Sequence, residues 1–154
     1  MFTHDISVWL PSSSLSKPYI GALKGHAGIV EDAKFLANFP IVVSIDNKNT
    51  VRVSSLEKMQ CLQVWKVEDS FCPKIHIFRS IPYLALYDKL ISYYKIQKED
   101  DFHYFNSKKN HEAKRTNISN TVLHVLYCDY YNCLLVLMEE RLKIITINNG
   151  KVFN

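Results

Sequence analysis

The chain has 154 residues, of which 47% are hydrophobic and 22% are charged, a mixture typical of a globular protein rather than a disordered or fibrous one. Its 19 basic and 15 acidic residues give a net charge of +4 and are scattered along the sequence, whereas a nucleic-acid-binding protein is expected to gather its basic residues into a patch. No apolar run approaches the roughly 18 residues needed to cross a bilayer, and residues 1–20 lack the pattern of a signal peptide. We therefore expect a cytoplasmic protein with no membrane partner.

Two short strands are predicted at the start of the chain. Residues 5–10, reading DISVWL, and residues 19–23, reading YIGAL, are rich in β-branched and aromatic side chains. Residues 11–18 between them, reading PSSSLSKP, contain proline and serine, which favour turns. Residues 4–24 are therefore expected to contribute a pair of strands.

The most regular β pattern lies in residues 25–66. After Gly25-His26, an apolar run ends at Phe35, and three further β-rich runs follow at residues 42–46, 50–53 and 61–64. Turn-forming residues separate these runs. We predict that residues 28–65 form four antiparallel strands in sequence order. A helical turn at residues 31–38 is the one local alternative.

The remaining sequence predicts seven more short β-rich elements. In residues 73–120, three strands are predicted at 74–78, 83–87 and 90–96, followed by a long loop at 97–120. Within that loop, residues 102–105 (FHYF) form an aromatic cluster, which is either the displaced fourth strand or a docking strip for a partner, and we favour the strand. Residues 121–154 predict strands at 121–127, 133–138 and 142–147, with the start of a fourth at 151–154.

This succession resembles the blades of the WD40-repeat β-propeller family. A blade of that family has four strands in about 40–45 residues, opens with Gly-His and closes its third strand with Trp-Asp. Gly25-His26 matches the opening, while Ser54-Ser55 replaces the closing pair. The resemblance implies an all-β fold, a WD40-like β-propeller fragment of four-stranded antiparallel blades in an incomplete ring. Its parts would be a half-blade (4–24), the best-matching blade (25–66), a degenerate blade (73–120) and a truncated blade (121–154).

The resemblance also assigns structural roles to single residues. In the family, a histidine, a serine or threonine, an aspartate and a tryptophan form a hydrogen-bonded string that joins three strands. His26, Ser44 and Asp46 would take the first three roles, and Trp9, followed by Leu10, would be the tryptophan of the preceding blade. Because Ser54 stands where the tryptophan of the best-matching blade is expected, that string would be incomplete. We predict that His26 lies within hydrogen-bond reach of Ser44 or Asp46.

The length of the chain bears on how such a fold could be completed. A propeller closes with about 4–8 blades, and 154 residues are too few for a WD40 ring. There are three alternatives: the chain is a fragment of a longer protein or a divergent gene model, its edges pair with another chain, or it forms an open stack of sheets. We favour the first, and we do not expect the isolated chain to be a compact, stable monomer, because its unpaired strand edges favour self-association.

Motifs for catalysis, metals and cofactors are missing from the sequence. It contains no Gly-x-Ser-x-Gly elbow, no glycine-rich phosphate loop and no His-Glu-x-x-His. Its cysteines, Cys61, Cys72, Cys128 and Cys133, lack the Cys-x-x-Cys spacing of a zinc site, and disulfides are not expected in the cytoplasm. We therefore expect no catalytic residues, no metal ligands and no cofactor, so the chain is not predicted to be an enzyme.

The resemblance implies a protein–protein interaction scaffold built from WD40 repeats, in a large cytoskeletal or ciliary assembly. The alternative is a WD40-like module of an RNA-processing or ribosome-assembly complex, which would require a basic face. The region richest in basic residues, 98–115, nets only +1, because acidic residues lie among its lysines and its arginine. We therefore expect the partners to be other proteins rather than nucleic acid or a small-molecule substrate.

Overall fold

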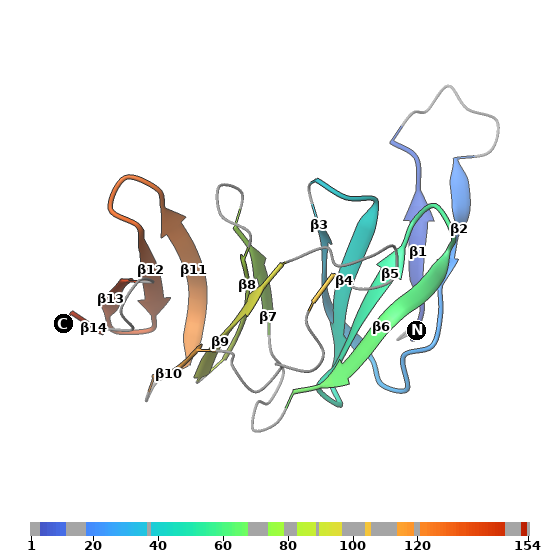
Figure 1. Ribbon diagram of the computed structural model, residues 1–154. Coiled ribbons are helices and arrows are strands. Elements are labelled where there is room, and N and C mark those ends of the chain that lie inside the picture. The colour runs from blue at the N-terminus through green and yellow to red at the C-terminus, as the bar shows by residue number, and fades with distance from the viewer. Residues whose placement is uncertain are drawn as a thin grey trace. The chain divides into compact units, whose positions relative to one another are not determined.

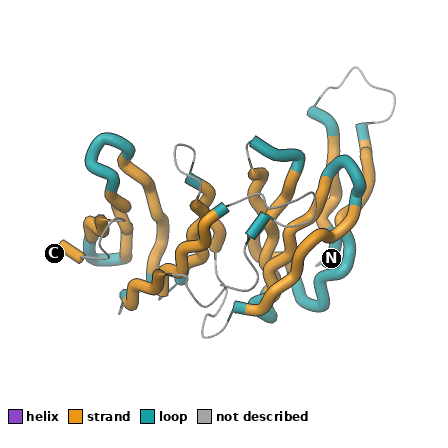
Figure 2. The backbone as a smooth tube through the Cα atoms, in the orientation of Figure 1, coloured by secondary structure: helices purple, strands orange, loops and turns teal. Residues whose placement is uncertain are grey.

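The computed structural model consists of β-strands joined by turns, and no helix occurs in the part of the chain that it describes (Figures 1 and 2). The described residues are 4–11, 18–36, 38–67, 74–78, 83–88, 90–96, 104–105, 114–118, 121–146 and 152–153. The chain divides into two compact units, Met1–Cys72 and Pro73–Asn154. Within the described residues, no helix has the length and hydrophobicity to cross a membrane. The prediction of an all-β chain is confirmed for these residues.

The first unit begins with two antiparallel strands, β1 (Ile6–Trp9) and β2 (Tyr19–Leu23). Ile6 lies opposite Leu23 and Trp9 opposite Tyr19, with a bulge before Trp9 that breaks the regular register. Both strands lie where the sequence predicts them. The segment between them, predicted to be a turn, lies mostly outside the described residues.

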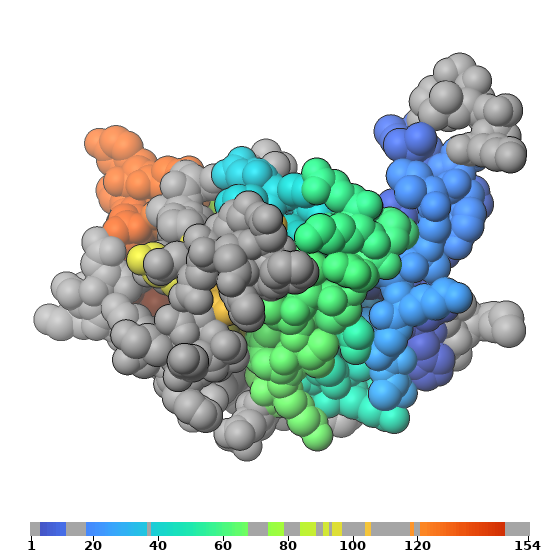
Figure 3. Space-filling view, turned by 45° about the vertical axis from the view of Figure 1, so that its right-hand side comes forward, coloured from blue at the N-terminus to red at the C-terminus, as the bar shows by residue number. Residues whose placement is uncertain are grey.

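The second sheet of this unit has four antiparallel strands in sequence order. They are β3 (Val30–Leu36), β4 (Ile41–Asp46), β5 (Thr50–Ser55) and β6 (Gln60–Lys66). This order confirms the predicted sheet, and since β3 is a strand, the helical turn considered for residues 31–38 is wrong. Every residue of β4 is buried, whereas β6 lies on the surface of the unit (Figure 3).

The second unit starts with a four-stranded antiparallel sheet in the order β10-β9-β8-β7. Its strands are β7 (Lys74–Ile77), β8 (Tyr83–Tyr87), β9 (Leu90–Lys95) and β10 (Lys114–Asn117). The fourth strand, β10, pairs with β9 and places Thr116 opposite Ile91. It therefore lies inside the segment 97–120, which was predicted to be a long loop with the fourth strand at residues 102–105.

The position of β10 shows that the favoured interpretation of residues 102–105 is wrong. Tyr104 and Phe105 lie in a bend, and both side chains are buried. Their burial also argues against a docking strip at these two positions; residues 102 and 103 lie outside the described part. Aromatic side chains signal burial as strongly as they signal a strand, so local composition does not separate the two.

The last sheet is antiparallel, in the order β11-β12-β13-β14. Its strands are β11 (Val122–Cys128), β12 (Cys133–Met138), β13 (Leu142–Thr146) and β14 (Val152–Phe153). The first three coincide with the strands predicted from sequence, and β14 begins where a fourth was expected. Each sheet in the described residues is open and ends in edge strands.

A shared apolar core joins the two sheets of the second unit. It contains Phe78, Ala85, Tyr87, Ile91 and Ile118 together with Val122, Val125, Leu134, Val136, Met138 and Ile145. Because successive side chains on a strand point to opposite faces, the residues between these core positions on β11–β13 lie on the other face of the last sheet. We call that side the outer face, and it carries Leu126, Leu135, Leu137, Leu142 and Ile144.

Candidate functional site

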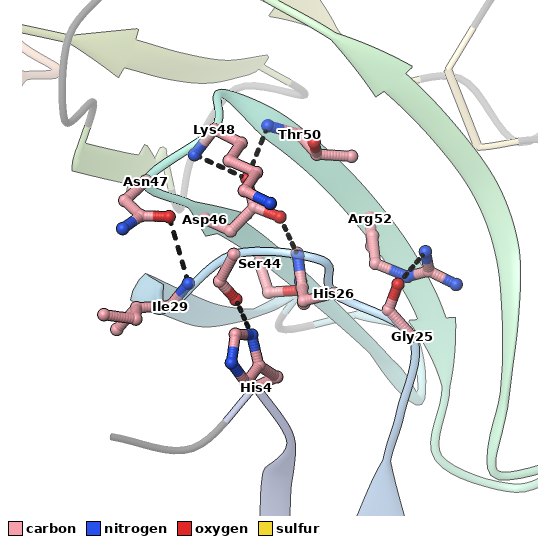
Figure 4. Close-up of polar contacts among 11 residues, drawn as sticks. His4, Gly25, His26, Ile29, Ser44, Asp46, Asn47, Lys48, Thr50 and Arg52 are labelled. Carbon is pink, nitrogen blue, oxygen red and sulfur yellow. Dashed lines mark hydrogen bonds and ion pairs between the residues drawn. The ribbon is translucent and has the colours of Figure 1, made fainter.

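A connected polar cluster surrounds His26 (Figure 4). His26 lies in the segment before β3, while Ser44 and Asp46 lie two residues apart on β4 and so on the same face of that strand. The distance from His26 Nδ1 to Asp46 Oδ2 is 2.9 Å, and that from His26 Nε2 to Ser44 Oγ is 2.8 Å. The predicted contact of His26 with Ser44 or Asp46 is therefore confirmed, and both bonds are present.

The partners fix the proton positions in this cluster. An ionised carboxylate can only accept hydrogen bonds, so Nδ1 of His26 carries a hydrogen and donates it to Asp46. In the neutral imidazole Nε2 is then an acceptor, and the Ser44 hydroxyl donates to it. Both ring nitrogens of this buried histidine are thus satisfied, as a buried polar group requires.

Asp46 also organises the turn between β4 and β5. Its Oδ1 accepts hydrogen bonds from the backbone amides of Lys48 at 3.0 Å and Thr50 at 2.9 Å. The Asn49 amide donates to the Asp46 carbonyl at 2.9 Å, and Asn49 has a φ of 62°. Asparagine tolerates this left-handed conformation better than most residues, so it can take the place of glycine in this turn.

The pKa of Asp46 is lowered from the ordinary value of 3.8. Burial acts in the opposite direction and is the largest single influence, because it penalises the charged carboxylate. The hydrogen bonds from the Thr50 amide, the His26 ring and the Lys48 amide together outweigh it. Asp46 is consequently a buried carboxylate that stays ionised through its hydrogen bonds.

Gly25 and Arg52 form a second contact that the sequence did not reveal. Arg52 Nη1 donates to the Gly25 carbonyl at 2.7 Å (Figure 4). Gly25 has a φ of 112°, and a Cβ at that position would lie 2.5 Å from Nη2 and 2.9 Å from Cζ of Arg52. Glycine is thus required here both by backbone conformation and by the close approach of the guanidinium. Arg52 thereby holds the segment that carries His26.

Three further hydrogen bonds attach the same segment to its surroundings. The Ile29 amide donates to Asn47 Oδ1 at 3.0 Å, and the Asn47 amide donates to the Ile29 carbonyl at 2.9 Å. His4 donates from Nδ1 to the Gly28 carbonyl at 2.8 Å. The His4 bond joins the segment before β3 to the residues before β1, and the Ile29–Asn47 bonds join it to the β4–β5 turn. None of these residues belongs to a motif that would have identified it from sequence.

Trp9, the fourth residue for which a structural role was predicted, lies apart from the His26 cluster. It lies on β1 with 60% of its surface exposed, and its ring contacts that of Tyr19 at a centroid distance of 5.0 Å. Ser54 is buried on β5 opposite Val42. The family role of Trp9 therefore stays a prediction.

The connectivity of Ser44, His26 and Asp46 is that of a serine hydrolase triad, in which the histidine accepts from the serine and donates to the aspartate. Catalysis also requires that the serine oxygen reach a substrate carbonyl. Ser44 is 1% exposed, and His26 and Asp46 are buried with it. The cluster can therefore hold β4, the following turn and the segment before β3 in place. A substrate cannot reach Ser44 in this arrangement, because its side chain is buried.

The described residues contain no group of three or more histidine, cysteine, aspartate or glutamate side chains placed to hold a metal ion. No family model matches the chain, and no curated protein matches it either. Any function assigned to the chain must therefore be argued from the geometry of its own sheets and side chains.

Proposed function

We propose that this chain is a WD40-like scaffold that binds another protein through the outer face of the sheet β11–β14. The observation that carries the proposal is the exposed apolar surface of that face. Leu142 is 61% exposed and Leu126 is 51% exposed, and Leu137 and Ile144 are exposed with them. Contiguous apolar patches of this kind on soluble proteins mark interaction surfaces.

The strand register makes these side chains neighbours. Leu126 lies opposite Leu135, and Leu135 lies opposite Ile144, which gives one apolar row across three strands. Leu137 lies opposite Leu142 and extends the patch by a second row. The other face of the same strands is buried in the core of the unit. Both faces of this sheet are therefore rich in apolar side chains, as surfaces that pack against another surface are.

The nature of the face favours a protein as the partner. Small-molecule sites are concave and surround most of their ligand, whereas a sheet face offers a broad row of side chains on which another apolar surface can pack. The buried His26 cluster supports the scaffold role, because its residues occupy the places that the WD40 resemblance assigns to structure. A large cytoplasmic assembly of the cytoskeletal or ciliary kind is the setting proposed for it.

The test compares partner binding by the wild-type chain and by the double variant Leu126→Lys/Leu142→Lys. Proteins that co-purify with the wild type are identified, purified and titrated against each form by calorimetry. Two charges on the face should weaken binding at least tenfold, which corresponds to about 1.4 kcal/mol. Val64→Lys, at an exposed position on β6 of the other unit, is the matched control and should bind like the wild type.

Two results would contradict the proposal. One is an unchanged affinity in the double variant when its melting temperature matches that of the control. The other is binding to RNA alone, with an affinity that falls steeply as salt is raised, since this is the behaviour of a contact made through phosphates. The second result would favour the RNA-processing alternative.

A further inference from the structure

The hairpin of β11 and β12 brings two cysteines together. Cys128 is the last residue of β11, Cys133 is the first of β12, and the register places them directly opposite each other. The connection between them contains a turn in which the Asn132 amide donates to the Asp129 carbonyl at 3.3 Å. Asn132 has a φ of 48°, and its Oδ1 accepts from the Tyr127 hydroxyl at 2.5 Å. These two hydrogen bonds hold the turn in shape and attach it to the end of β11.

A cross-strand pair has the separation that a disulfide needs. Directly opposed residues of antiparallel strands have Cα atoms about 4.5 or 5.5 Å apart, depending on whether the pair is hydrogen-bonded. Disulfides form at Cα separations of about 4.4–6.8 Å. Opposed residues also point to the same face, so the side chains of Cys128 and Cys133 are direct neighbours. Both thiols are free, so the pair is a dithiol.

Cys61 is an ordinary strand cysteine and serves as a comparison for the Cys128–Cys133 pair. It lies on β6 of the other unit, where its thiol donates to the Gln63 carbonyl at 3.3 Å. Cys72 lies outside the described residues. The pairing of residues 128 and 133 was not predicted, because the four residues between these cysteines do not match a known metal or redox spacing.

We infer that Cys128 and Cys133 form a reversible intrachain disulfide when the chain meets a low-molecular-weight disulfide such as oxidised glutathione. The thiolate of Cys128 attacks one sulfur of glutathione disulfide, forms a mixed disulfide and releases one glutathione thiolate. The thiolate of Cys133 then attacks the Cys128 sulfur and releases the second glutathione. The dithiol loses two protons and two electrons, and one glutathione disulfide becomes two glutathione molecules.

The surroundings of the two thiols set the order of these steps. Cys128 is half-buried and can be reached from solvent, whereas Cys133 is 4% exposed. Burial, reinforced by the neighbouring Cys128, raises the pKa of the Cys133 thiol. Because only the thiolate attacks, Cys128 is the first nucleophile, and closure by Cys133 accelerates as the pH rises.

The disulfide would close the base of an exposed aromatic loop. Tyr130 and Tyr131, at the tip between the two cysteines, are 87% and 71% exposed, and their rings contact each other at 4.8 Å. A covalent bond between the strands beneath them restricts the conformations available to this tip. The oxidation state of the pair therefore controls how two exposed tyrosines are presented to a partner.

The folded chain is tested by incubation with glutathione disulfide at several ratios to reduced glutathione, followed by alkylation, trypsin digestion and mass spectrometry. Residues 116–141 form a single tryptic peptide that contains Cys128 and Cys133 and no other cysteine. Oxidation should lower the mass of this peptide by two hydrogen atoms and protect it from alkylation, and dithiothreitol should reverse both changes. The rate of closure should rise with pH.

Single variants separate the pair from general thiol oxidation. Cys128→Ser and Cys133→Ser should each abolish the internal bond, and Cys61→Ser should oxidise at 128 and 133 as the wild type does. The inference is overturned if the folded wild type gives only mixed disulfides with glutathione or bonds between chains. It is also overturned if the internal bond forms only after denaturation in urea.

Discussion

The side chain of His26 donates a 2.9 Å hydrogen bond to the buried carboxylate of Asp46, which joins the segment before β3 to the end of β4. The same carboxylate holds the amides of the β4–β5 turn. A single ionised group therefore satisfies donors from two parts of the sheet. The consequences can be measured in the stability of the chain.

Replacement of Asp46 by alanine should be strongly destabilising. The amides of Lys48 and Thr50 and the ring of His26 would lose their acceptor, and each buried polar group left without a partner costs about 1–3 kcal/mol. We expect the free energy of unfolding, from urea titration, to fall by at least about 2 kcal/mol. Asp32→Ala is the control, because the Asp32 carboxylate pairs with Lys34 near the surface and should cost less than about 1 kcal/mol. Equal losses in the two variants would contradict the role given to Asp46.

Stability should also fall at acid pH because of the same residue. Since the pKa of Asp46 is lower in the folded chain than its ordinary value of 3.8, the folded state favours the ionised carboxylate. This contribution is complete above the unfolded pKa and is lost as the pH falls through the folded one. In Asp46→Asn the contribution is absent. We therefore expect the stability difference between wild type and Asp46→Asn to be constant near neutrality and to shrink below about pH 4. A difference that does not change with pH would refute this.

Ser44 separates the structural role of the cluster from a catalytic one. Ser44→Ala removes one buried hydrogen bond to His26 and should lower the free energy of unfolding by about 1 kcal/mol. Because Ser44 is buried, the native wild type should not react with a fluorophosphonate probe, which labels accessible nucleophilic serines. Labelling that is lost in Ser44→Ala would show instead that the triad is reachable and active.

Two glycines offer a matched comparison of backbone conformation. Gly25→Ala places a Cβ against the Arg52 guanidinium at a φ of 112° and should destabilise the chain by more than about 1 kcal/mol. In Gly21→Ala the new Cβ meets only the end of the Met59 side chain, at 2.9 Å, which can move aside. We expect the melting temperature to fall markedly for the first variant and little for the second. The reverse order would show that the Arg52 contact does not constrain Gly25.

The sequence predicted most strands because their signals are local. In β4 and β5, alternation of side chains and turn residues on either side define each strand without reference to the rest of the chain. The contacts of His26 were also predictable, since the Gly25-His26 opening placed it against Ser44 and Asp46 through the WD40 resemblance. Membership of that family stays a prediction.

Sequence patterns were thus sufficient to predict an all-β chain, the strands β1–β9 and β11–β13, and the partners of His26. The folded chain was needed to establish that β10 pairs with β9, that Tyr104 and Phe105 are buried, and that Cys128 faces Cys133. The reason is that strand propensity is a property of a few neighbouring residues, whereas pairing and register depend on which distant segment supplies the hydrogen bonds. β10 has the sequence KRTN, with little β signal of its own, and it is a strand because β9 offers it an edge.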